Sequence, residues 1–199
     1  MSMPLILASG SAIRATLLQN AGLSFSIEKP RVDEAMLKSA LIAEQAPPRD
    51  IADALAEMKA RKISEKNPDA LVLGCDQVLD HRGALLSKPQ SKPEALQQLQ
   101  ALRGDRHMLL SAAVIYHAGQ PQWRHIGQVR LRMRPASDGY LSGYVERNWD
   151  SIRHAVGAYK LEEEGVRLFT AIEGDYFTVL GLPLLEILTY LTQRGALEQ

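Results

Sequence analysis

The chain has 199 residues, of which 46% are hydrophobic and 23% are charged, a balance typical of a soluble globular protein with a sizeable core. Lysine plus arginine and aspartate plus glutamate both total 23, so the formal net charge is zero. This balance argues against stable nucleic-acid binding, which normally needs a basic excess. No apolar run approaches the roughly 18 residues of a membrane span, and the N-terminus lacks the basic region of a secretion signal.

The cysteine and histidine content excludes two kinds of site. The single cysteine, Cys75, allows no internal disulfide framework and no Cys-rich zinc site, and it fits a reduced, cytoplasmic location. The histidines fall at no metal-ligand spacing, so we interpret all five as structural or surface residues: His81, His107, His117, His125 and His154.

The first part of the chain predicts alternating strands and helices. In chain order these are a strand over Leu5–Ala8, a helix through Leu17 and Leu18, a strand at Phe25 and Ile27, a helix over Asp50–Ile63 and a buried strand over Ala70–Gly74. Gly22 occupies the position where glycine commonly ends a helix. Ile51, Leu55 and Met58 share one face of their helix.

The remainder continues this pattern. We expect a helix over Lys92–Leu102, a buried strand over Leu109–Tyr116, a half-exposed strand over Val129–Met133 and a last helix opened by Pro183 and closed by Gly195. The alternation predicts an α/β fold, with residues 1–199 forming one domain that has two lobes around a groove.

The turn Ser9-Gly10-Ser11 lies between a strand and a helix and is the first candidate for chemistry. A helix N-terminus carries free N–H groups and partial positive charge, and two hydroxyls and Arg14 would add donors for phosphate oxygens. The alternative interpretation is an ordinary helix start with Ser11 as the N-cap residue.

Three acids form the second candidate. Asp76 follows a buried apolar run, and strand ends are where α/β folds build sites. A carboxylate there can bind Mg²⁺ or accept a proton from an attacking water. The alternative is that Asp33 and Glu34 are solvated loop acids and that Asp76 caps a turn.

Two lysines form the third candidate. Lys59 lies at the edge of the apolar stripe of its helix, one turn beyond Leu55, so its ammonium can lean into a cleft. Lys88 precedes Pro89, which stiffens the backbone there. The alternative is that both are ordinary surface lysines.

Taken together, these motifs resemble the Maf family of nucleotide pyrophosphatases over almost the whole chain. The matching stretches are Ser9–Leu18 for S-x-S-P-R-R-x-x-L-L, Asp33-Glu34 for the acidic pair, Met58-Lys59-Ala60 for E-K-A, Gly74–Gln77 for G-x-D-[TQ], Ser87-Lys88-Pro89 for G-K-P, and Gly157-Ala158-Tyr159 and Ile172–Tyr176 leading to Gly181–Leu184. The order and spacing of these stretches carry the resemblance.

The resemblance implies a Maf/ITPase-like domain: a mixed twisted sheet whose flanking helices form two lobes around a central cleft. It implies that Asp76 deprotonates the water that attacks the α-phosphorus. Glu34 and Asp76 would hold a divalent metal, Mg²⁺ or Mn²⁺. Four residues would bind the triphosphate: Ser9, Arg14, Lys59 and Lys88. The implied partner is a nucleoside triphosphate, and the implied assembly is a homodimer.

Three further positions face the base in the family, here Ile13, Gln77 and Glu162, with the run Glu162–Glu164 leaving the choice of glutamate open by a residue or two. Gln77 and Glu162 resemble the branch that acts on 7-methyl-GTP. A carboxylate can accept two hydrogen bonds from guanine, from N1–H and the exocyclic amine. Ile13 replaces the tryptophan that would stack on a methylated, cationic ring. We therefore expect a guanine-type base without a strict preference for the methylated form.

The chain also departs from the family elsewhere, since Ala12-Ile13 replaces proline and the first arginine, and Arg103–His107 stands for S-G-R-T-H. The charges that hydrolysis needs remain. The leading hypothesis is therefore a metal-dependent pyrophosphatase with a house-cleaning role against modified nucleotides. The alternative is a catalytically weak nucleotide-binding regulator of cell division and septum formation.

Overall fold

A computed structural model of the chain describes residues 3–197. Its seven strands are β1 (Leu5–Ala8), β2 (Ser26–Ile27), β3 (Leu71–His81), β4 (Ala84–Leu86), β5 (Arg106–His117), β6 (Gln120–Met133) and β7 (Phe169–Glu173). The helices are α1 (Ala12–Asn20), α2 (Glu34–Ala43), α3 (Pro48–Ser64), α4 (Lys92–Leu102), α5 (Asp138–Ile152), α6 (Tyr176–Val179) and α7 (Leu184–Gln193), with 3₁₀ turns η1 (Val156–Ala158) and η2 (Glu164–Leu168).

All strands belong to one mixed sheet in the order β2-β1-β3-β5-β6-β7, with β4 paired to β3. Strand β1 runs parallel to both β2 and β3, whereas the β3–β5, β5–β6 and β6–β7 pairs are antiparallel. The sheet therefore changes character along β3, which is parallel to its neighbour on one side and antiparallel on the other.

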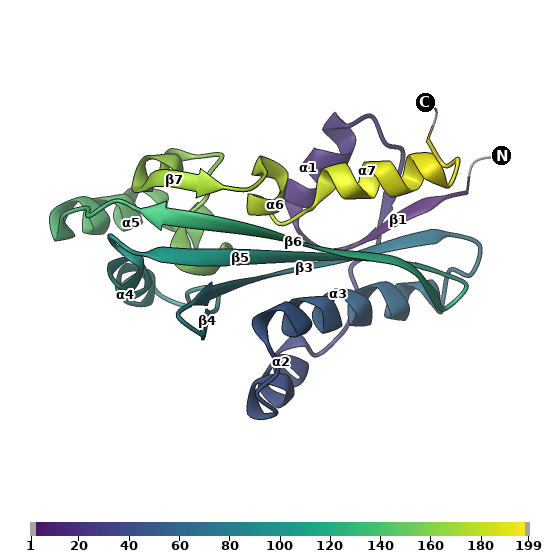
Figure 1. Cartoon of the computed structure of the whole chain (residues 1–199), viewed down its shortest axis with the longest axis horizontal. Helices are drawn as coiled ribbons and strands as arrows, with labels where there is room; N and C mark the ends of the chain where they lie inside the picture. Colours follow the sequence, from purple (N-terminus) through teal and green to yellow (C-terminus); the bar gives the residue numbers. More distant parts are fainter. Residues whose placement is uncertain (1–2, 198–199) are drawn as a thin grey trace.

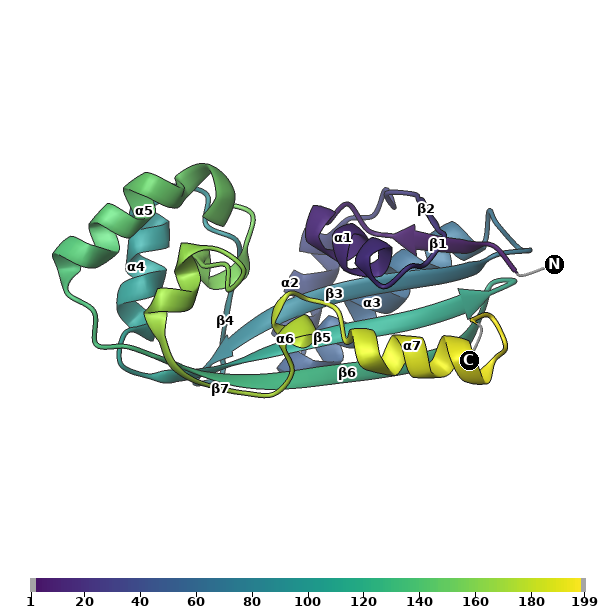
Figure 2. The same ribbon diagram turned by 90° about the horizontal axis from the view of Figure 1, so that it is seen from above.

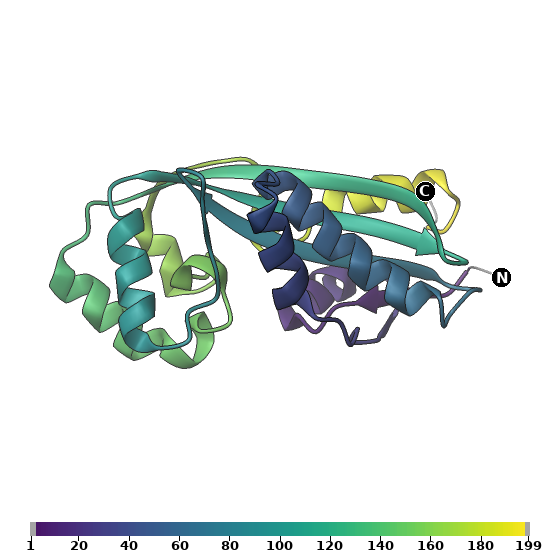
Figure 3. The same ribbon diagram turned by 90° about the horizontal axis from the view of Figure 1, so that it is seen from below.

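Helices gather at both ends of the long strands and form two lobes (Figures 1 and 2). In the main lobe, α2 and α3 lie on one face of the sheet, and α1, α6 and α7 lie on the other. The helical lobe consists of α4, α5 and the two 3₁₀ turns at the far end of β3, β5 and β6 (Figure 3). The long strands run through both lobes, as the predicted two-lobed α/β fold requires.

The hydrophobic core also spans both lobes. One cluster of buried residues joins Leu18 of α1 to Leu99 of α4 and Tyr144 of α5. A second cluster packs α3 against the opposite sheet face through Ile51, among others. Within the described residues, no helix has the length and hydropathy that a membrane crossing needs.

Most predicted elements are confirmed, and two have the predicted bounds: the strand Leu5–Ala8 and the helix Lys92–Leu102. Val129, Leu131 and Met133 are buried and alternate with exposed arginines, as predicted for a half-exposed strand. Helices α2 and α5 were not predicted. Helix α2 has no fully buried residue, although Leu37 and Leu41, one helical turn apart, pack against the second core cluster.

Candidate functional site

Asp76 lies within strand β3, and the prediction that it ends a strand is wrong. The strand continues to His81 because β5 pairs with it as far as Asp80 and β4 pairs with it at His81. The other edge of β3 is interrupted, however. Its pairing with β1 ends at Gly74, and its pairing with β4 begins at Leu79. Asp76 therefore lies at a notch in the sheet, just beyond the carboxyl end of the parallel strand β1.

The helix α3 approaches this notch unusually closely at Gly74. A Cβ atom on Gly74 would lie 2.3 Å from the Ala56 carbonyl oxygen and 2.6 Å from the Ala60 nitrogen. Only glycine permits this approach of helix and strand. Because Lys59 precedes Ala60 and Asp76 points to the same sheet face as Gly74, the contact brings the two charged side chains together.

Lys59 bridges two carboxylates from different elements. Its Nζ lies 2.6 Å from Oδ1 of Asp76 and 2.9 Å from Oε2 of Glu34. The Lys59 and Asp76 side chains are only 8% and 12% exposed, whereas that of Glu34 is 50% exposed. An ammonium group has three N–H donors, so one remains for a ligand. Lys59 is thus a buried cation, and the surface-lysine alternative is wrong for it.

Glu34 reaches this position because it starts helix α2. Asp33 is the N-cap residue, and its Oδ1 accepts a hydrogen bond from the Met36 backbone N–H at 2.9 Å. The solvated-loop interpretation is therefore wrong for Glu34, whereas Asp33 is an exposed acid just outside the helix whose side chain caps it. Helical spacing then places Lys38 one turn beyond Glu34 on the same face. The Lys38 ammonium donates to Oγ of Ser87 at 2.8 Å.

Arg14 enters the notch from helix α1 and is held by three acceptors. Its Nε donates to the Gly181 carbonyl at 2.8 Å, and its Nη1 donates to the Cys75 carbonyl at 2.9 Å and to Oγ of Ser9 at 3.3 Å. Within residues 3–197, no hydrogen bond engages Nη2, so its two N–H groups are available to an anion.

Ser9 and Ser11 make different contacts at the start of α1. Ser11 is the N-cap residue, as the alternative interpretation proposed, but its side chain makes no capping hydrogen bond. Ser9 is buried, and its Oγ accepts from the Ser11 backbone N–H at 3.2 Å. The side chain of Ser11 therefore leaves the backbone N–H groups of the first helical turn uncapped.

Two further lysines add positive charge near the notch: Lys38 on α2 and Lys88 in the loop between β4 and α4. The Lys88 side chain is exposed, yet nearby protein atoms partly remove water from its ammonium, and this lowers its pKa. The positive charges of Arg14 and Lys59 lower it further, while Asp76 and Glu34 oppose this. Burial also lowers the pKa of Lys38, and the charge of Asp76 acts in the opposite direction. Of these cations, Lys59 is the one in direct contact with the two carboxylates.

The three positions that the resemblance assigned to the base share no contact within the described part of the chain. Ile13 packs against the main core cluster. Gln77 points to the sheet face opposite Asp76, and its Nε2 lies 2.9–3.1 Å from Oγ of Ser111 and the carbonyls of Thr178 and Val179. Glu162 is exposed on the helical lobe. Their roles in base selection stay predictions.

The structure separates the three adjacent glutamates. Glu163 accepts from Ser151 and Lys160. Glu164 accepts from Arg147 and Asn148, which lowers its pKa to about 2. Within residues 3–197, Glu162 has no such partner, so it alone of the three keeps a carboxylate free for a ligand.

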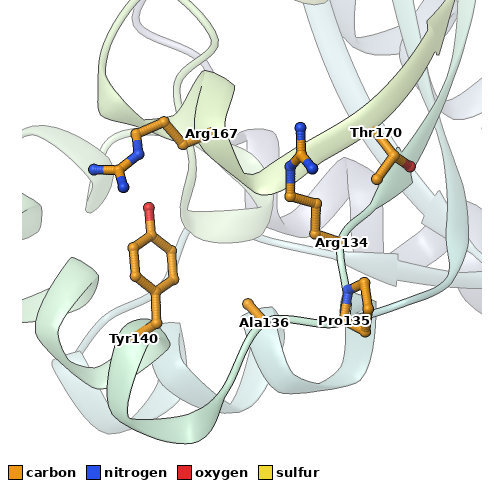
Figure 4. A pocket seen from close by; sticks show the side chains of 6 residues that line it. All are labelled: Arg134, Pro135, Ala136, Tyr140, Arg167 and Thr170. Carbon is orange, nitrogen blue, oxygen red and sulfur yellow. The ribbon is translucent and has the colours of Figure 1, made fainter.

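An open hollow of about 520 Å³ lies elsewhere on the molecule, between the end of β6, α5, η2 and β7, and Figure 4 shows the side chains that line it. Its lining residues are Arg134, Pro135, Ala136, Tyr140, Arg167 and Thr170. The Arg167 guanidinium lies over the Tyr140 ring, 5.5 Å from its centroid. No carboxylate and none of the predicted site residues lines this hollow, so it is separate from the notch.

Sequence reasoning missed two contributors to the notch. Lys38 could have been found from its i,i+4 spacing to Glu34, had α2 been recognised as a helix. Gly181 has a φ of 92° and supplies the carbonyl that holds Arg14. No local signal identifies that contact, because 167 positions separate the two residues.

The comparisons with known proteins agree with the motifs. The family described as Maf-like protein matches residues 4–194. A Ruegeria pomeroyi protein named nucleoside triphosphate pyrophosphatase is 71% identical, with 100% of both chains covered. A Brucella abortus protein named 7-methyl-GTP pyrophosphatase is 41% identical, also with 100% of both chains covered. A solved Mycobacterium abscessus structure named nucleoside-triphosphatase / dITP/XTP pyrophosphatase is 12% identical, covers 97% of this chain and 95% of its own, and has a TM-score of 0.40.

Proposed function

Because this chain belongs to the Maf family, we propose that it hydrolyses a nucleoside triphosphate between the α- and β-phosphates. Water attacks the α-phosphorus, the bond to the bridging oxygen breaks, and a nucleoside monophosphate and pyrophosphate leave. The name of the 71% identical relative supports this reaction. The resemblance of this chain to the family, inferred above from the motifs, is confirmed by the family match over residues 4–194.

The single observation that carries the proposal is the convergence of Arg14, Lys59 and Asp76 on one notch of the sheet. Cleavage of a phosphoric anhydride depends mainly on positioning and on neutralising negative charge. Arg14 is held through backbone carbonyls, so its free Nη2 is fixed in place before a ligand arrives. Lys59 and Lys88 add positive charge from two other elements.

Asp76 is the general base in this proposal. Its Oδ1 accepts from Lys59 at 2.6 Å, whereas Oδ2 has no hydrogen-bond partner within residues 3–197. The free oxygen can take a proton from the attacking water. Lys59 fixes the orientation of the carboxylate at the same time. A positioned base of this kind contributes about 10²–10⁴-fold to a rate.

A divalent cation, Mg²⁺ or Mn²⁺, fits the same acids. Glu34 and Asp76 come from α2 and β3 and converge on one ammonium, so both carboxylates face a common cationic position. Within residues 3–197, no cluster of three or more His, Cys, Asp or Glu side chains is arranged as a metal site. Glu34 and Asp76 would therefore share the ion with phosphate oxygens and water, as is common for Mg²⁺. When bound, the ion neutralises phosphate charge.

The proposed substrate has a guanine-type base, and Glu162 is the residue proposed to recognise it. Its carboxylate is exposed and unpaired in the described part of the chain, whereas its two neighbours are engaged. The 41% identical relative is named for a guanine nucleotide, which supports the same class of base. Ile13 offers apolar contact without cation–π attraction, so methylation is not required.

The test is pyrophosphate release by the purified chain from natural and methylated triphosphates, with Mg²⁺ or Mn²⁺. We expect release with a guanine-type substrate. Asp76→Asn should lose at least about 100-fold in kcat while still binding the nucleotide. Asp69→Asn, which changes an exposed acid with no hydrogen bond or ion pair among residues 3–197, is the matched control. Binding without release by the wild type would favour the regulatory alternative.

A further inference from the structure

Lys38 is a fourth cation at the notch that neither the motifs nor the roles above use. It lies on the same face of α2 as Glu34, one turn further along the helix. Glu34 is committed to Lys59 at 2.9 Å, and among residues 3–197 no carboxylate forms an ion pair with the Lys38 ammonium. The site therefore contains a partly buried lysine whose charge no acid neutralises by contact.

The contact that Lys38 does make fixes its position. Its Nζ donates to Oγ of Ser87 at 2.8 Å, and Ser87 directly precedes Lys88. The Ser87 carbonyl in turn accepts from Nε2 of Gln98, a buried residue of α4, at 3.0 Å. The hydrogen bond to Ser87 uses one of the three N–H donors of the ammonium, so two remain for an anion.

The placement of Lys38 relative to Asp76 decides which phosphate it can reach. Glu34, Lys59 and Asp76 form one contact cluster at the reaction centre. Lys38 lies about 5–6 Å further along α2, as i,i+4 side chains do. Its ammonium contacts Ser87, the residue before Lys88, so it lies toward the loop that carries Lys88 and beyond the Glu34–Lys59–Asp76 cluster.

We propose that Lys38, together with Lys88, binds the β- and γ-phosphates and stabilises the pyrophosphate as it leaves. The inference rests on the proposed function, since it assigns the leaving group of that reaction. Breaking the α–β anhydride transfers the bonding electrons to the bridging oxygen of the pyrophosphate. A cation beside that group lowers the cost of the developing charge. The part of the substrate recognised here is its β,γ-diphosphate end, which is the same whatever the base.

Equilibrium binding of pyrophosphate to the full chain, with Mg²⁺ present, tests this directly. Lys38→Gln should weaken pyrophosphate binding by about tenfold, the range expected for a lost hydrogen bond to a charged group. The affinity of the Lys38→Gln variant for guanosine monophosphate should stay within about twofold of the wild-type value, because that product lies on the other side of the broken bond. Lys62→Gln removes the same charge from an exposed position of α3 and should change neither affinity.

The Ser87→Ala variant tests whether Lys38 binds phosphate itself or only links α2 to the loop before α4 through its hydrogen bond to Ser87. If Lys38 only ties α2 to the loop before α4, then Ser87→Ala and Lys38→Gln will weaken pyrophosphate binding equally, and the proposal fails. It also fails if Lys38→Gln binds pyrophosphate as the wild type does, or loses the monophosphate instead. The proposed function fails differently: the wild type would release no pyrophosphate from any triphosphate, while Lys38-dependent binding could still be measured.

Discussion

The Lys59 ammonium lies 2.6 Å from Oδ1 of Asp76, and both side chains are almost completely buried. The pair is asymmetric, because Lys59 also contacts Glu34 while Asp76 has no second cation at ion-pair distance within the described residues. Loss of the lysine therefore leaves a buried carboxylate without its partner. Loss of the aspartate charge leaves the lysine still paired.

This asymmetry predicts unequal costs in stability. Lys59→Met should lower the free energy of unfolding by about 3 kcal/mol, as expected when one partner of a buried pair is removed. Asp76→Asn should cost about 1 kcal/mol, since its amide oxygen can still accept from Lys59. Urea unfolding of both variants measures the difference. Equal losses would show that Glu34 does not compensate the lysine.

The close approach at Gly74 predicts that a single methyl group disrupts the site. In Gly74→Ala the new Cβ would lie 2.3 Å from the Ala56 carbonyl, which forces α3 away from β3. Overpacking of this kind costs about 1–3 kcal/mol, and activity should fall because Lys59 moves with its helix. Gly139→Ala on α5 is the matched control, since no atom lies within 4 Å of the added Cβ. Similar melting temperatures for the two variants would contradict the prediction.

Base selection can be tested on adjacent glutamates. Glu162→Gln should reduce the preference for guanine over other bases by about tenfold, because the amide replaces one of the two acceptor oxygens with an NH₂ donor that faces a donor of the base. Glu163→Gln should leave selectivity unchanged, since that carboxylate already accepts from Ser151 and Lys160. The ratio of kcat/KM values for different triphosphates is the measurement. A shift in Glu163→Gln alone would transfer the role to that residue.

His107 predicts a loss of stability in mild acid. Burial, followed by the charge of His81, lowers its pKa from 6.5 to about 4 against the opposing charge of Asp105. The unfolded chain binds a proton near pH 6.5 that the folded chain resists, so stability is full above this pH and is lost as pH falls toward 4. The loss should approach about 3 kcal/mol for a shift of this size.

Melting temperatures between pH 4 and pH 7 check this expectation. His107→Phe should flatten the profile, because the ring keeps its packing against Tyr159 and Phe169 but cannot be protonated. His154→Phe changes an exposed histidine and should leave the slope unchanged. An unchanged slope in His107→Phe would assign the acid sensitivity to other groups.

The sequence by itself determined the family, the α/β fold class and the elements with a clear apolar period. Leu5–Ala8 and Lys92–Leu102 were predictable because burial of one face imposes a pattern on neighbouring residues. The chemistry-bearing residues could also be named, since their types and order survive in the motifs. Helix α2 was not predicted: it has no fully buried residue, and only Leu37 and Leu41, one turn apart, pack against the core, which is a weak periodic signal.

Only the tertiary structure decided which of these charges meet. Lys59 and Asp76 are 17 positions apart, and their contact depends on the helix–strand approach that Gly74 permits. Arg14 is held by a carbonyl 167 positions away, and Lys38 contacts a loop 49 positions away. Local patterns report which face of an element is buried. They do not report which distant backbone or charge will stabilise a given side chain, because that depends on how the sheet and helices pack.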